Sequence, residues 1–190
     1  QDCEKILFDD RSAMAELMLP FLFEAEASYP DFVSAAHPDL RNGLDLLATW
    51  NYRMDTDSTA ATYFNFWTDK LYSLLPETYD SESAFQKALV DKEKGAFLLI
   101  LRAAAEAGMH MRNEFQSLEV AWGDIHRLEQ PALALPGSRL GQTLYAAECW
   151  RPTPREFPVN YGTGFAQVVE FLDEPRTSSV APFNNPPAAR

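Results

Sequence analysis

Three histidines are the first residues whose chemistry could build a site, because histidine serves as a metal ligand and as a general base. His37 precedes Pro38 at an expected helix start, His110 lies near the end of an expected long helix, and His126 follows a short acidic stretch. A zinc site usually shows two ligands a few residues apart, and no two of these histidines are that close. The spacing therefore favours surface or helix-capping histidines and predicts no metal site.

Two aspartates, Asp55 and Asp57, resemble the first ligands of a calcium loop, which also needs a glycine at its turn and a closing glutamate. Neither follows at the required position, so capping of the next helix is the favoured interpretation. Two carboxylates could also act as acid and base, as in glycosidases. The spacing selects no such pair from the 28 acidic residues.

Candidate nucleophiles are equally unsupported. Ser138 follows Gly137 in Pro-Gly-Ser-Arg, which lacks the strand–elbow–helix context of a Gly-x-Ser-x-Gly motif, so a surface turn is predicted. Cys3 and Cys149 fit no metal spacing. They could pair in an oxidising compartment or remain buried thiols. The residues alone thus predict no catalytic or metal-binding residue and leave substrate-binding residues unknown.

Composition excludes several classes of protein. The net charge of -12 argues against a nucleic-acid partner, since phosphate binding needs clustered Lys and Arg. No apolar run approaches the ~20 residues of a membrane span, and a hydrophobic content of 46% argues for a packed core. The chain opens on Gln1 within an apparently structured segment, which suggests that an upstream portion has been removed.

Apolar residues at spacings of three and four predict helices through the first two-thirds of the chain. Asp10 or Ser12 is expected to cap the first, with a kink at Pro20. Further helices are expected at about 40–50, 59–75, 81–88 and 93–111. Strands are expected at 143–150, 164–171 and 178–183, and alternation in the second suggests that both of its faces are partly covered.

The predicted fold class is α+β, with a helical bundle at residues 1–116, a segment of a few antiparallel strands at 117–183 and a flexible tail at 184–190. The aromatic residues Trp50, Phe64 and Trp67 are expected to pack in the core and not to contact a ligand.

Four blocks, in order, resemble the β chain of the penicillin amidase family, which includes penicillin, cephalosporin and acyl-homoserine-lactone acylases. The first is a helix with a Leu-Pro ending at residues 10–20, and the second spans 46–61, with Asn51 where aspartate is usual. The third joins Trp-Gly-Asp-Ile-His-Arg at 122–127 to Leu-Pro-Gly at 135–137, and the fourth is the strand at 162–171. The likeness runs from about residue 6 to 183.

This resemblance implies a C-terminal-half segment of the β chain of an N-terminal-nucleophile hydrolase with an αββα fold. In that family a serine freed by autocatalytic cleavage attacks an amide, with its own α-amine as base. Gln1 cannot take that role, so the serine, the oxyanion groups and the ligands of a calcium ion would lie in other segments, with no cofactor in this one. Some cephalosporin acylases carry a supporting glutamate where this chain has Thr163, so that role is not transferred.

The implied parent is a periplasmic or secreted acylase acting on acyl side-chain amides, such as those of β-lactams or acyl-homoserine lactones. This segment would support the catalytic core, shape one side of the acyl pocket and be inactive alone, with the remaining catalytic α and β segments as partners. Two alternatives stay open: a non-catalytic helical interaction or scaffold domain, and an unrelated enzyme with a carboxylate site.

Overall fold

The computed structural model describes residues 5–6, 9–75, 78–128, 132–139, 142–144, 147–162 and 166–180. Helices occupy the first part and short antiparallel strand pairs the second, so the α+β prediction is confirmed. The longer helices are α2 (Ala13–Ser28), α4 (Pro38–Ala48), α5 (Thr59–Leu74), α6 (Glu82–Val90) and α7 (Lys94–Phe115), and the short ones are α3 (Pro30–Ala35) and α8 (Trp122–Ile125).

Serine side chains begin three of these helices. The hydroxyl oxygens of Ser12, Ser58 and Ser81 each accept a hydrogen bond from the backbone N–H three residues later, at 3.1, 3.1 and 3.2 Å. Such caps satisfy N–H groups that have no partner within the helix. Ser12, and not Asp10, is therefore the first cap. Pro20 lies inside α2 without ending it.

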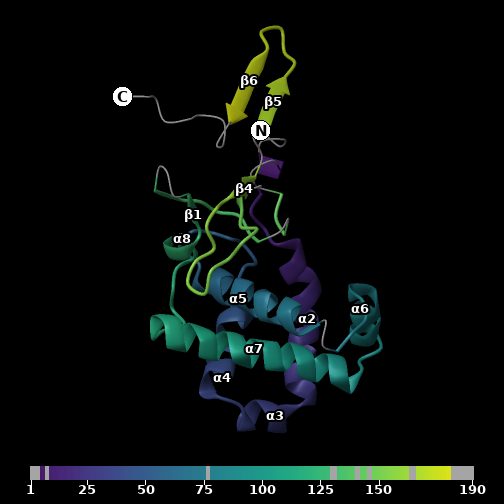
Figure 1. The fold of residues 1–190 in the computed structure, drawn as a ribbon. Coiled ribbons are helices and arrows are strands. Elements are labelled where there is room, and N and C mark those ends of the chain that lie inside the picture. The colour runs from purple at the N-terminus through teal and green to yellow at the C-terminus, as the bar shows by residue number, and fades with distance from the viewer. Residues whose placement is uncertain are drawn as a thin grey trace.

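Helix α7 runs through the middle of the bundle, with α5 on one side and α4 on the other (Figure 1). It extends to Phe115, four residues beyond the predicted end at 111. Tyr63 and Trp67 of α5 are fully buried and donate hydrogen bonds to the α7 carbonyls of Ala104 (2.7 Å) and Ile100 (3.1 Å). These bonds fix α5 against α7, because a buried polar group without a partner is costly.

The predicted core aromatics are confirmed: Trp50 is 9% exposed, and Phe64 and Trp67 are fully buried. The same core includes Trp122, Ile125, Cys149 and Phe157 from the second part of the chain. The core therefore spans residues on both sides of position 116, and the predicted division there stays a prediction.

Strands form three antiparallel pairs: β1 (Arg127–Leu128) with β2 (Leu133–Ala134), β3 (Ala147–Glu148) with β4 (Tyr161–Gly162), and β5 (Ala166–Glu170) with β6 (Arg176–Val180). Within the predicted strand at 143–150, Ala147 and Glu148 pair with β4, whereas residues 143–144 bend and residues 145–146 lie outside the described part. β6 begins earlier than the predicted 178, and residues 181–183 lie outside the described part.

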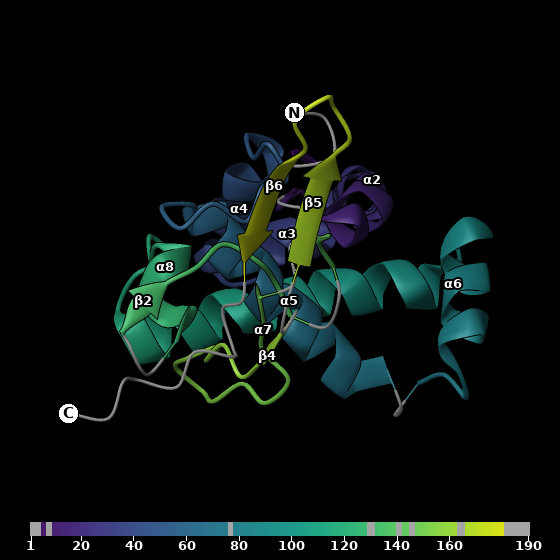
Figure 2. The ribbon, with the colours of Figure 1, turned by 90° about the horizontal axis from the view of Figure 1, so that it is seen from above.

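The β5–β6 hairpin projects away from the helical bundle (Figure 1), and in the view from above it lies over the helices (Figure 2). Phe171 is 87% exposed, Leu172 50% and Val169 38%. Val168, on one face of the strand predicted at 164–171, is half-buried, whereas Val169 and Phe171 on the other face are exposed. The prediction that both faces are partly covered is therefore wrong for the face of Val169 and Phe171. Within the described ranges, no layer covers Val169, Phe171 or Leu172.

Candidate functional site

His126 is fully buried, so its interpretation as a surface or capping residue is wrong. Its ring lies between two backbone carbonyls, with Nδ1 2.9 Å from Phe157 O and Nε2 3.1 Å from Ala147 O. The indole of Trp122 stacks on it. Burial lowers its pKa from 6.5 to about 4, although both carbonyl contacts favour the charged ring. This histidine joins α8 to β3 and to the segment around Phe157. Because its ring is fully buried, a substrate could not reach it.

The other two histidines agree with the prediction. His37 Nδ1 accepts a hydrogen bond from the backbone N–H of Asp39 (3.2 Å) and so caps α4. His110 is partly exposed on α7, with Nε2 2.6 Å from the carbonyl of Pro154. Both rings face backbone groups, which is a structural use of histidine and not a nucleophile–base contact.

Ser138 is also fully buried, which overturns the predicted surface turn. Gly137, with a φ of 120°, lies so close to β3 that a Cβ there would be 2.3 Å from Ala147 O. The segment instead runs beside β3, where the N–H of Ser138 donates to Ala147 O (3.1 Å) and the N–H of Cys149 donates to Ser138 O (3.2 Å). Ser138 Oγ accepts a hydrogen bond from the N–H of Gln142 (3.1 Å). The hydroxyl serves the loop and is closed to a substrate.

Cys149 is a fully buried free thiol. Burial raises its pKa to about 11, which keeps the sulfur protonated and unreactive at neutral pH. The sequence left its pairing with Cys3 open, and Cys3 lies outside the described residues, as does Thr163.

Asp55 takes part in a carboxylate pair and does not cap α5; that interpretation was wrong, since Ser58 is the cap. Asp10 is 6% exposed, and Arg53 Nη2 lies 2.6 Å from its Oδ1. Burial first, and then the charge of Asp55, raise the pKa of Asp10, while Arg53 lowers it. Asp57 is exposed and likewise does not supply the cap.

The backbone N–H of Met54 donates to Asp10 O at 3.0 Å, so this cluster ties the start of α2 to the α4–α5 connection. No group of three His, Cys, Asp or Glu in the described ranges is placed to hold a metal.

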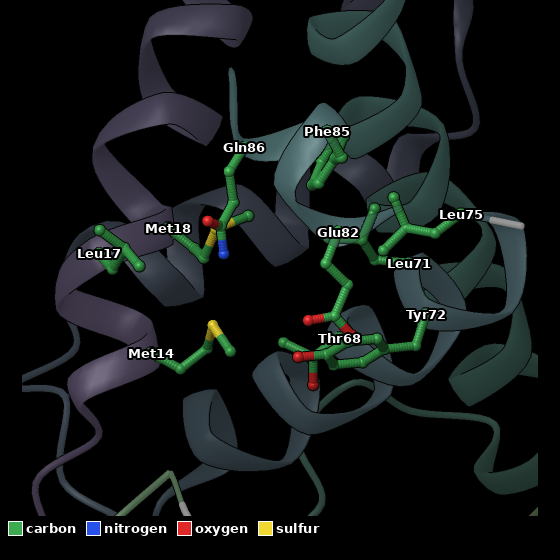
Figure 3. A pocket seen from close by; sticks show the side chains of 10 residues that line it. All are labelled: Met14, Leu17, Met18, Thr68, Leu71, Tyr72, Leu75, Glu82, Phe85 and Gln86. Atoms are coloured by element: carbon green, nitrogen blue, oxygen red, sulfur yellow. The ribbon is translucent and has the colours of Figure 1, made fainter. Parts of the chain in front are cut away.

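A pocket of about 60 Å³ opens between α2, α5 and α6 (Figure 3). Met14 and Met18 point into it from α2, and Glu82 and Phe85 enclose it from α6. Its full lining is Met14, Leu17, Met18, Thr68, Leu71, Tyr72, Leu75, Glu82, Phe85 and Gln86. The sequence analysis missed this site, although the methionines four residues apart already placed two apolar side chains on one face of a helix.

An ion pair lies on the α5 side of this region. Arg139 Nη1 is 2.5 Å from Asp69 Oδ1, and the arginine side chain is only 15% exposed. Arg139 and Glu82 both act on the pKa of Tyr72: burial raises it most, Glu82 raises it further and Arg139 lowers it. Arg139, the cation that acts on Tyr72, is thus already engaged by Asp69.

No helix in the described ranges combines the length and the apolar character needed to cross a membrane. The sequence model of the family described as penicillin amidase matches residues 1–186. No curated protein matches the chain.

Proposed function

Since this chain belongs to the penicillin amidase family, we propose that it is a segment of an amide-hydrolysing acylase that supports the catalytic core without supplying the nucleophile. The family match over residues 1–186 is the observation that carries the proposal. It covers the helices and the strands together, and so assigns both to one hydrolase family.

The surroundings of the candidate nucleophiles support the second half of the proposal. Ser138 and Cys149 are fully buried, and the ring nitrogens of His126 face carbonyl oxygens. An activated serine or cysteine needs a base within hydrogen-bond reach and an open approach for the substrate. None of these three described residues has that arrangement.

The parent would hydrolyse the amide of an acyl side chain, as in β-lactams or acyl-homoserine lactones, in the periplasm or after secretion. Its remaining catalytic segments would be the partners of this chain, and the calcium ion implied by the family would bind among them. The exposed apolar residues Phe171 and Leu172 on the β5–β6 hairpin support a covering partner, because solvent-exposed hydrophobic clusters commonly mark interaction surfaces.

An activity assay tests the proposal directly. The purified 190-residue chain is expected to hydrolyse no chromogenic acyl amide, and the full product of its gene is expected to do so. Ser138→Ala and Cys149→Ala variants control for turnover by the chain itself. Activity of the isolated chain that survives purification and disappears in one of these variants contradicts the supporting role.

The alternative, a non-catalytic scaffold domain of the same family, is favoured by the projecting hairpin. It also predicts an inactive chain. The two differ in the gene product: a scaffold remains inactive when its flanking sequence is restored, whereas an acylase segment gains turnover.

A further inference from the structure

The pocket between α2, α5 and α6 combines an apolar interior with one carboxylate at its edge. Leu71, Leu75 and Phe85 are buried side chains in its wall. Figure 3 shows the Glu82 carboxylate directed toward the space shared with Thr68 and the ring of Tyr72. A ligand that fits this lining needs an apolar body and a cationic or hydrogen-bond-donating head.

The charges around the pocket do not cancel within the described part of the chain. Arg139 is paired with Asp69 at 2.5 Å, and no described basic side chain forms an ion pair with Glu82. The carboxylate thus stays available to a cation. The aromatic rings of Tyr72 and Phe85 line the same space, and ring faces attract cations.

Size limits the ligand further. A water molecule occupies about 30 Å³ in the liquid, so a pocket of about 60 Å³ encloses about two groups of that size. We propose that this pocket binds a small primary alkylammonium ion, with the end of its alkyl chain between the methionines and the ammonium group against Glu82.

A simpler role for Glu82 is stabilisation of α6, since a carboxylate in the first turn interacts favourably with the helix dipole. Ser81 already caps this helix by accepting from the N–H of Ala84 at 3.2 Å. The two roles differ in one measurable respect: only a binding site makes the affinity for an alkylammonium ion depend on Glu82.

The test is a titration of the whole chain with hexylammonium chloride, followed by NMR of ¹³C-labelled methionine methyl groups. We expect the Met14 and Met18 methyl signals to shift, with a Kd on the order of 1 mM. Hexan-1-ol should bind more weakly, and hexanoate should bind least, because Glu82 repels it. Equal binding of the three compounds, or no shift of these two signals, overturns the proposal.

Two variants and a matched control locate the interaction. Glu82→Gln should weaken hexylammonium binding about two- to fivefold while leaving hexan-1-ol unchanged. Glu174→Gln, the same charge change on the β5–β6 turn, should change neither. Gln86→Phe, at an exposed position on the rim, should block both ligands; circular dichroism checks that each variant is folded. Unchanged hexylammonium binding in folded Glu82→Gln assigns that residue to helix stabilisation alone and rejects the site.

Discussion

The rings of Trp122 and His126 stack with centroids 4.5 Å apart and planes inclined by 16°. The indole N–H of Trp122 donates to Gly137 O at 2.9 Å, and His126 contacts Phe157 O and Ala147 O. One stacked pair thus anchors three separate segments of the second part of the chain. Because the pair is fully buried, the charge of the imidazole controls how well these segments hold together.

Acid should therefore loosen this junction. The lowered pKa of His126, about 4 against 6.5, means that the folded protein binds fewer protons than the unfolded chain between these values. Stabilisation by the neutral ring is complete above about pH 6.5 and is lost as the pH falls toward about 4, by about 3 kcal/mol. Urea unfolding at several pH values between 7 and 4 measures this loss of unfolding free energy.

His126→Gln should remove most of that pH dependence, since no ring is left to protonate. Phe157→Leu is the matched control: it thins the packing on Trp122 and should lower stability at every pH while keeping the slope. An unchanged slope in His126→Gln would contradict this account.

Close helix contact gives a second prediction. A Cβ on Gly43 would lie 2.0 Å from Tyr63 Cζ, and this buried ring is held by its bond to Ala104 O. Gly43→Ala should therefore destabilise the fold by about 1–3 kcal/mol through overpacking. Gly95→Ala is the control, because its nearest neighbour is 3.7 Å away, and it should be neutral or slightly stabilising. Thermal unfolding that ranks the two variants the other way contradicts the predicted contact.

Removal of the Tyr63 hydroxyl tests the same helix pair from the other side. Tyr63→Phe keeps the ring but leaves the Ala104 carbonyl without this donor, which should lower the unfolding free energy by about 1–2 kcal/mol. Tyr161→Phe, at a residue that is 51% exposed, should change stability little. Equal effects of the two substitutions would show that the buried bond contributes nothing.

The helical part was largely predictable because its signals are local. Ser58 and Ser81 each stand before an apolar pattern of helical period, and both are caps in the structure. The choice between Asp10 and Ser12 was not decidable from sequence, because both are capping residues and only tertiary contact with Arg53 engages Asp10 elsewhere.

The second part of the chain was predicted less well because its contacts are distant in sequence. Burial of His126 depends on Phe157 and Ala147, and burial of Ser138 depends on the approach of Gly137 to β3. The pocket is built by three helices, and a pattern within one helix does not reveal its neighbours. Family resemblance supplied what local periodicity could not, the penicillin amidase assignment.

The carboxylate cluster yields a fourth prediction. Arg53 is the cation beside the raised-pKa Asp10, so Arg53→Gln leaves Asp10 and Asp55 without it. The loss of stability should be about 1 kcal/mol at neutral pH. It should shrink as the pH falls through the raised pKa of Asp10, because protonation removes the repulsion. Asp55→Asn in the Arg53→Gln background should restore part of the stability at neutral pH, and a loss independent of pH contradicts the electrostatic origin.

The β5–β6 hairpin gives the last prediction. An isolated two-stranded hairpin is marginal in water, and Phe171, 87% exposed, adds little to the stability of this chain. Phe171→Ser should therefore change the unfolding free energy by less than about 0.5 kcal/mol but reduce binding of a hydrophobic dye and self-association. Val90→Ser, at a residue that is 66% exposed on α6, is the control and should leave both unchanged. Loss of folding in Phe171→Ser would show that the side chain stabilises this chain itself, and unaltered dye binding would remove the hairpin as the surface for a partner.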